Sequence, residues 1–233
     1  MENNFNFKTF LFIDSKKIII SVYSDINQKI YQEKLVFDSK MQDLSFDNLD
    51  LFLNKNIFKI EKKLKSFIKN VYVILDSNKF FTVEISLKKK NYENVFDLKS
   101  LNYLLYEAKD YCRKTIDDRK IIHMIINNYQ IDNKSYPFFP IDVSGNNFSI
   151  DISFICISNR LIKKLEKILK KYHISLSQIV SANYAMKFLI NDEKDIFLMS
   201  KKIMNGHNPN EVMLVEKTSK NEGFFEKFFN FFR

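Results

Sequence analysis

Glycine is scarce in this sequence, with only Gly145, Gly206 and Gly223 among 233 residues, and no two of them are neighbours. Loops that cradle phosphate groups depend on glycine, because a residue without a Cβ lets backbone N–H groups approach the ligand closely. The scarcity therefore argues against a nucleotide site built from Gly-rich hairpins.

Cysteine is also scarce, and only Cys112 and Cys156 occur. Both fall on apolar faces of regular segments and no amino-terminal signal pattern is present, so we expect buried thiols in a reducing cytoplasm. The three histidines are widely separated, with no Cys or carboxylate at ligand spacing, so we expect no metal site.

Long apolar runs are missing, since no segment approaches the roughly 20 apolar residues that a transmembrane helix needs. If the protein meets a membrane, we expect it to lie on the surface. Charge of one sign dominates, because 37 Lys and Arg face 28 Asp and Glu, giving a net charge of +9. Such a surface attracts nucleic acid, anionic lipid or an acidic partner. The basic helix faces at 59–69 and 163–171 are typical of solvated surfaces, with contact to anionic lipid as the alternative.

Apolar residues make up 45% of the chain, enough for a core in one domain or in two small ones. Hydrophobic periodicity first predicts three strands, a helix and a buried strand, over residues 9–13, 18–23, 30–37, 46–68 and 71–75. A strand, a helix and two strands follow over 80–87, 97–113, 120–126 and 148–157. The last predicted elements are a helix, a strand, a helix and a mostly polar linker, over 161–172, 178–180, 183–190 and 191–218.

This order predicts an α/β (α+β) fold with the layout of an RNase H-like or actin-like half-domain, interrupted by an inserted unit. The sequences DLKSLNYLLYEAKDYCRKTIDDRKIIHMIINNYQID, PFFPIDVSG and FSIDISFICIS resemble the FtsA family in order and spacing. FtsA proteins are actin-like bacterial cell-division proteins that tie FtsZ filaments to the membrane. The resemblance covers about residues 8–190.

The resemblance implies a domain organisation. Residues 1–79 and 159–190 would form the first actin-like subdomain, and residues 80–158 an inserted SHS2-type strand-helix-strand-strand module. A linker at 191–218 would lead to an amphipathic helix at 219–233. The inserted module would contact neighbouring copies and other division proteins.

Departures from the family pattern concern the nucleotide. The segment IDSKK keeps Asp14 but lacks the glycine of the family's first phosphate loop. The second actin half, which docks FtsZ in the family, has no counterpart, because about 43 residues follow Ile190. We therefore expect no ATP, no cofactor, no enzymatic activity and no nucleic-acid partner, and the missing half puts direct FtsZ binding in doubt.

The carboxy-terminal segment SKNEGFFEKFFNFFR predicts an amphipathic helix. Ser219 and Glu222 have the spacing of a capping box, and one helical face gathers the phenylalanines. We expect this face to bind the cytoplasmic face of the cell membrane, and self-docking on the core or binding in a partner's groove are the alternatives. The predicted membrane-binding residues are Phe224, Phe225, Phe228, Phe229, Phe231, Phe232, Lys227 and Arg233.

A second candidate surface is the loop at 127–145 in the inserted module, which the position in the family favours for protein contacts. Its candidate contact residues are Tyr129, Tyr136, Pro137, Phe138, Phe139 and Pro140. The sequence thus predicts a non-enzymatic, membrane-associated adaptor of bacterial cell division, acting in divisome or Z-ring assembly.

Two alternatives remain open at this point. One is an actin-like adaptor of the type IV pilus machinery, which shares the SHS2-type organisation. The other is an RNase H-like metal-dependent nuclease. Its carboxylates would be Asp14 and Asp76 at strand ends, with Glu61 on the intervening helix as a third.

Overall fold

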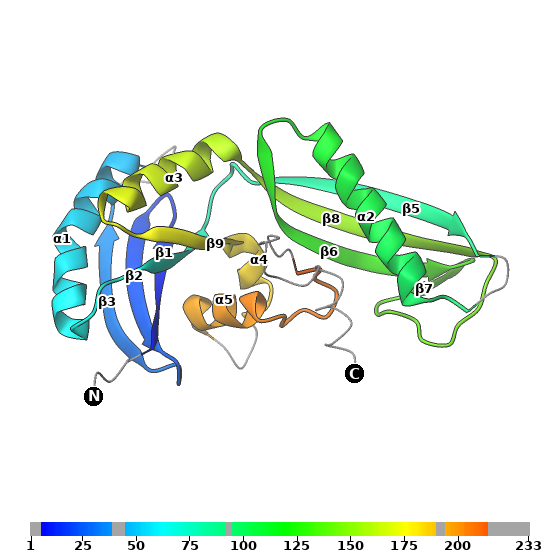
Figure 1. Ribbon diagram of the computed structural model, residues 1–233, viewed down its shortest axis with the longest axis horizontal. Coiled ribbons are helices and arrows are strands. Elements are labelled where there is room, and N and C mark those ends of the chain that lie inside the picture. Colours follow the sequence, from blue (N-terminus) through cyan, green and yellow to red (C-terminus); the bar gives the residue numbers. More distant parts are fainter. Residues whose placement is uncertain (1–5, 39–44, 92–94, 190–193, 214–233) are drawn as a thin grey trace. The chain divides into compact units, whose positions relative to one another are not determined.

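The computed structural model describes residues 6–38, 45–91, 95–189 and 194–213 of the chain. The described chain forms two compact units (Figure 1). Unit 1 comprises Met1–Phe80 and Ile157–His207, and unit 2 comprises Phe81–Cys156 and the segment that begins at Asn208. Unit 2 is therefore inserted between two parts of unit 1.

Unit 1 contains a five-stranded sheet with the order β3-β2-β1-β4-β9. The strands β1, β2 and β3 form an antiparallel meander, whereas β4 runs parallel to both β1 and β9. The strands are β1 (Phe7–Ile13), β2 (Lys17–Ser24), β3 (Lys29–Val36), β4 (Asn70–Leu75) and β9 (Ser175–Ser181). Parallel strand pairs such as β1–β4 and β4–β9 need crossover connections, which are usually helices.

Helices cover both faces of this sheet, and α1 and α5 lie on opposite sides of it (Figure 1). All residues from Thr9 to Ile13 in β1 are buried, as expected for a strand covered on two faces. On one face, the rings of Phe10 and Tyr23 contact Phe197 of α5 at centroid distances of 6.1 and 6.0 Å. The helices of unit 1 are α1 (Phe46–Leu64), α3 (Asn159–Lys171), α4 (Ala182–Met186) and α5 (Ile196–Met204).

Helix α1 has well-defined ends. Its N-cap Ser45 accepts a hydrogen bond from the Asn48 N–H, and its C-cap Lys65 adopts the left-handed conformation, with φ of 52°. The sequence prediction placed the end of this helix at Ile68, but the left-handed cap stops it at Leu64. The residues that follow form a turn whose Ile68 is buried.

Asp50 joins helix α1 to the end of helix α3. Its carboxylate accepts hydrogen bonds from the Lys171 Nζ at 2.5 Å and from the Tyr172 hydroxyl at 2.8 Å. The Tyr172 hydroxyl also lies 2.8 Å from the Asp50 main-chain oxygen. The hydrogen bonds from Lys171 and Tyr172 lower the pKa of Asp50. This contact fixes how the two helices pack on the sheet.

Unit 2 contains a four-stranded sheet with the order β5-β8-β6-β7 and one long helix. Its elements are β5 (Phe81–Lys90), α2 (Leu98–Thr115), β6 (Arg119–Ile131), β7 (Lys134–Tyr136) and β8 (Asn147–Ser158). Helix α2 covers one face, and the core between them includes Phe96, Leu104, Ala108, Phe148 and Phe154.

Both cysteines belong to this core. Cys112 and Cys156 have no exposed surface, so the prediction of buried thiols is confirmed. Burial raises the pKa of Cys112 and raises that of Cys156 to about 12. Both thiols are therefore protonated at neutral pH and chemically inert.

The prediction of a linker at 191–218 is wrong for much of its described part. Helix α5 begins after its N-cap Asp195, and it buries Phe197, Met199 and Ile203 in unit 1. Val212 is buried in the core of unit 2. Apolar residues at helical spacing stand between the polar runs of this segment, and burying them offsets the entropy cost of ordering it.

The other elements predicted between residues 9 and 190 exist, with shifted ends. Strand β9 is longer than the predicted 178–180, α4 ends at Met186 rather than at 190, and the short strand β7 was not predicted. The predicted fold class is confirmed, since unit 1 has the strand order of an actin-like half-domain and is interrupted by an α+β unit. Among the described helices, none is long and apolar enough to cross a bilayer.

Replacing Asp50 with Asn should lower the free energy of unfolding by about 1 kcal/mol at neutral pH. The folded-state pKa of Asp50 is below its ordinary value of 3.8, so its stabilisation is present above that value and is lost as pH falls through the folded-state pKa. Urea unfolding at neutral pH and at about pH 3 should show a difference between wild type and variant that shrinks in acid. The same change at the exposed Asp110 should alter stability little at either pH.

Candidate interaction surfaces

The loop between β1 and β2 occupies the position at which the FtsA-like pattern has its first phosphate loop, and the sequence predicts no phosphate binding there. The Asp14 Oδ1 accepts hydrogen bonds from the backbone N–H groups of Lys16 and Lys17, both at 2.6 Å. The Asp14 N–H in turn donates to the Lys17 carbonyl at 3.0 Å, which closes a tight Asx-type hairpin. The N–H groups that could hold a phosphate therefore bind an internal carboxylate, whose charge also repels phosphate.

Two of the three carboxylates proposed for a nuclease, those of Asp14 and Glu61, accept hydrogen bonds from backbone N–H groups. The Glu61 Oε1 accepts a hydrogen bond from the Ile68 N–H at 3.0 Å and so fixes the turn after α1. The Asp76 N–H donates to the Ile13 carbonyl at 2.9 Å in the extension of the parallel pair. Within the described ranges, no group of three or more His, Cys, Asp or Glu side chains could hold a metal ion.

The predicted contact loop contributes more to the core than to the surface. Tyr129 is 3% exposed, and burial raises its pKa to about 12. The core residues of β6 are Met124 and Ile126, and then Tyr129 and Ile131, so the alternation shifts by one position as at a β-bulge. This shift turns Tyr129 inward, and its assignment as a contact residue is corrected.

The remaining predicted contact residues divide into two groups. Pro140 is buried, and Tyr136 and Phe139 pack against the core of unit 2. Pro137 and Phe138 are exposed, and 60% of the Phe138 surface is accessible. Only these two keep the exposure that a contact residue needs.

Two further apolar residues near this loop are exposed, and sequence reasoning missed them. Ile141 is 74% exposed and Val95 is 55% exposed. Val95 forms an antiparallel bridge with Ser144, which brings it to the same loop. We call Val95, Phe138 and Ile141 the apolar tip of unit 2. The sequence did contain a signal for these exposed residues. Phe138 and Ile141 are large apolar residues next to prolines, and Val95 follows a polar segment.

Aromatic rings in the core of unit 2 pack next to the segments that carry the apolar tip. The ring of Phe96 stacks on Phe148 with centroids 3.3 Å apart and contacts Phe139 at 5.4 Å. The Phe96 N–H donates to the Val143 carbonyl at 3.0 Å. The buried neighbours of Val95 and Phe138 in sequence therefore hold the tip in place.

The base of the same loop is closed by Asp132 and Gly145. The Asp132 Oδ1 accepts hydrogen bonds from the N–H groups of Asn146 and Asn147 at 3.1 and 2.9 Å, and these bonds lower the pKa of Asp132. A Cβ on Gly145 would lie 2.3 Å from the Ile131 Cγ2. Glycine is needed here because the loop backbone before β8 passes so close to the side chains of Ile131 and Asp132.

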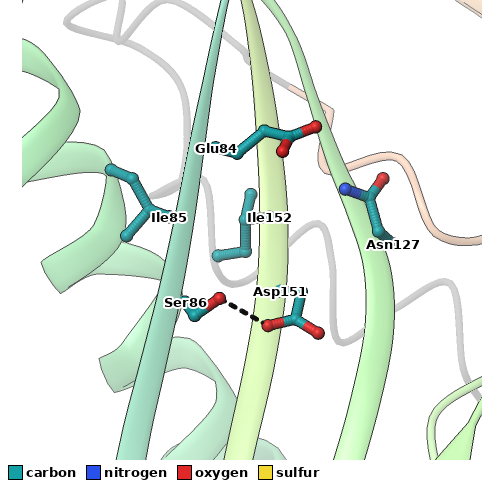
Figure 2. A pocket seen from close by; sticks show the side chains of 6 residues that line it. All are labelled: Glu84, Ile85, Ser86, Asn127, Asp151 and Ile152. Atoms are coloured by element: carbon teal, nitrogen blue, oxygen red, sulfur yellow. Dashed lines mark hydrogen bonds between the residues drawn. The ribbon is translucent and has the colours of Figure 1, made fainter.

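The sheet face of unit 2 that points away from α2 is polar (Figure 2). The Ser86 hydroxyl donates to the Asp151 Oδ1 at 2.6 Å, and the Asn128 amide donates to the Asp151 Oδ2 at 3.2 Å. An open pocket on this face is lined by Glu84, Ile85, Ser86, Asn127, Asp151 and Ile152. Because Ser86, Asn128 and Asp151 form hydrogen bonds with one another, we interpret this face as the solvent-facing side of a sheet whose other side is buried.

Residues 208–213 attach to the free edge of β6 in unit 2. The Ile126 N–H donates to the Asn210 carbonyl at 2.9 Å, and the Val212 N–H donates to the Met124 carbonyl at 2.8 Å. The His123 Nδ1 lies 2.7 Å from the Glu211 Oε1, and both side chains are almost fully buried. The chain therefore leaves the described structure from this strand edge. The predicted membrane-binding residues lie outside the described residues: Phe224, Phe225, Phe228, Phe229, Phe231, Phe232, Lys227 and Arg233.

No protein-family model matches the sequence, and no curated protein is similar to it. Several solved structures are similar in fold. The cytoplasmic domain of EpsL, an inner-membrane component of the type II secretion system of Vibrio cholerae, is 12% identical with a TM-score of 0.37, and the match covers 77% of this chain and 57% of that one. A PilM–PilN type IV pilus biogenesis complex is 10% identical with a TM-score of 0.44, covering 76% and 48%.

A Bacteroides thetaiotaomicron protein of actin-like ATPase fold and unknown function is 13% identical, with a TM-score of 0.30 and coverage of 80% and 58%. The chain thus spans between 48% and 58% of the length of these structures. At such low identity and TM-score, the similarities establish no shared activity or partner.

Replacing Gly145 with Ala should lower the free energy of unfolding by about 1 to 3 kcal/mol, because the new methyl group would overlap the buried Ile131 side chain. Thermal or urea unfolding measures the change. Ser144→Ala alters an exposed neighbour and should have little effect. Equal stability of both variants would contradict the close approach at Gly145.

Proposed function

We propose that this chain is a non-catalytic adaptor that binds a protein partner through the apolar tip of unit 2. The observation that carries the proposal is the tip itself, in which Val95, Phe138 and Ile141 are each more than half exposed over a fixed aromatic core. Exposed apolar residues on a rigid support are typical of contact sites, because the binding surface is already formed before the partner arrives.

The geometry of the Asp14 hairpin supports the absence of catalysis in this proposal. Its N–H groups are bonded to the Asp14 carboxylate, and the candidate carboxylate Glu61 is bonded to the Ile68 N–H. A nucleotide or a two-metal centre would have to break these bonds before it could bind. An adaptor requires neither.

We infer that the adaptor acts at the cytoplasmic face of the membrane in bacterial cell division. The resemblance of residues 8–190 to FtsA supports division as the process, and the sequence of residues 219–233 supports membrane association. Full burial of a Phe side chain contributes roughly 1.5 to 3 kcal/mol to the free energy of binding, and a membrane interface provides part of this. The loss of conformational entropy when the segment becomes helical opposes the binding. Single copies should therefore bind reversibly, and linked copies more firmly.

The double variant Phe138→Ser and Ile141→Ser should weaken binding to the partner roughly tenfold or more, because two apolar anchors are lost. A bacterial two-hybrid matrix should test the chain against itself and against the division and pilus proteins of its own genome. The matched control is Phe81→Ser, which changes another exposed phenylalanine of unit 2.

The control should bind as the wild type does. A signal with division proteins that the double variant loses would support the proposal. Unchanged binding by the double variant would refute the role of the tip, and a signal confined to pilus proteins would refute the assignment to division.

Removing residues 218–233 should lower the fraction of protein that floats with liposomes of a bacterial lipid mixture. The reason is that six phenylalanines are lost, while residues 208–213 and their contacts in unit 2 remain. Flotation of the intact chain beside the chain ending at Lys217 measures the difference. Equal flotation of the two would remove the tail from the proposal and leave the tip untouched.

A further inference from the structure

The outer face of helix α1 exposes large apolar side chains. Leu51 is 67% exposed and Phe58 is 72% exposed. They are seven residues apart and so lie on one stripe of the helix, opposite the stripe of Leu53 and Ile60 that packs into unit 1. The packing of α1 on its sheet therefore forces these two side chains into solvent.

The turn that follows α1 exposes a third large apolar residue. Phe67 is 77% exposed, whereas the next residue, Ile68, is only 2% exposed. The Ser66 N–H donates to the Glu61 carbonyl at 3.3 Å, and the Ile68 N–H donates to the Glu61 carboxylate at 3.0 Å. These bonds and the buried Ile68 fix the turn, so Phe67 projects outward as part of the fold.

Positive charge predominates around Phe58 and Phe67, whereas the exposed Asp47 lies one helical turn before Leu51. Between residues 51 and 70 the chain has one acidic residue, Glu61, and six lysines. Lys63 lies over the ring of Tyr31. The other five are exposed, and the described part of the structure gives them no ion pair: Lys55, Lys59, Lys62, Lys65 and Lys69.

We propose that this surface, the Lys–Phe face of α1, binds the anionic headgroup region of a lipid bilayer. The face consists of Leu51, Lys55, Phe58, Lys59, Lys62 and Phe67. Lysines attract anionic lipids, while Phe and Leu side chains insert at the boundary between headgroups and acyl chains. The contact belongs to unit 1 and does not depend on residues 218–233.

The chemistry of the face favours a bilayer over other acidic partners. Arg recognises the carboxylates of a protein or the phosphates of a nucleic acid most specifically, because its guanidinium group forms two parallel hydrogen bonds. The basic residues between 51 and 70 are all Lys. A bilayer needs no matching shape, so it accepts the convex outer side of a helix.

Vesicle co-sedimentation tests the proposal with two variants of the face. The charge variant is Lys59→Glu with Lys62→Glu, and the apolar variant is Leu51→Gln with Phe58→Gln. The matched controls in unit 2 are Lys88→Glu with Lys90→Glu and Phe81→Gln with Tyr106→Gln, which make the same kinds of change at exposed positions outside the apolar tip. Each is made in the full chain and in the chain ending at Lys217, and thermal unfolding verifies that all of them fold.

Vesicles of phosphatidylcholine with phosphatidylglycerol should bind both versions of the wild-type chain, and phosphatidylcholine alone should bind them less. Each face variant should lower the bound-to-free ratio on anionic vesicles roughly tenfold, and the controls should change it little. Added salt should weaken the binding of the wild type. The chain ending at Lys217 separates this contact from the proposed tail contact, and the binding that the face variants lose in that shorter chain measures the contribution of the α1 face.

Equal binding by the face variants and their controls would overturn the proposal, whatever the tail does. Labelled polyuridylate and polyglutamate serve as the competing polyanions. If the face variants lose binding to one of these polymers but keep vesicle binding, the face recognises a nucleic acid or an acidic protein, and the lipid assignment is wrong.

Discussion

The paired central strands β1 and β4 set the main constraint on unit 1. Both are rich in buried residues, and an apolar strand exposed on either face would be costly, so helices must cover the sheet on two sides. This requirement fixes the inner stripe of α1 and holds Phe197 of α5 against Phe10. The outer stripe of α1, with its lysines and exposed Leu51 and Phe58, is what the core leaves for function.

Unit 2 solves a different packing problem, because a single helix covers a single face of its sheet. The opposite face carries polar side chains that bond to one another, such as Ser86 with Asp151. The core then extends through the stacked Phe96 and Phe148 to the loop after β7. Not every apolar residue near this loop is buried in the core, and the exposed ones, Val95, Phe138 and Ile141, form the apolar tip.

Periodicity in the sequence predicted the elements that have one apolar face or a continuous apolar run. Periodicity gave a wrong prediction where the same local pattern was compatible with two structures. The polar runs around α5 suggested a linker, although Phe197 and Ile203 are buried. The alternation in β6 suggested a strand that ends at Ile126, because the pattern shifts before Tyr129. The alternation of side chains along β6 alone does not show where the inward-facing positions shift, because such a shift depends on how β6 pairs with the neighbouring strand.

The sequence by itself determined the order of the elements from β1 to α4 apart from the short β7, the burial of both cysteines, the excess of positive charge and the scarcity of glycine. These follow from residue type and short-range spacing. Only the tertiary structure decided that the Asp14 carboxylate occupies its own loop, that Tyr129 is buried, and that Val95 joins Phe138 and Ile141. Each of these depends on contacts between residues distant in sequence or on side-chain direction, which packing of the whole unit fixes.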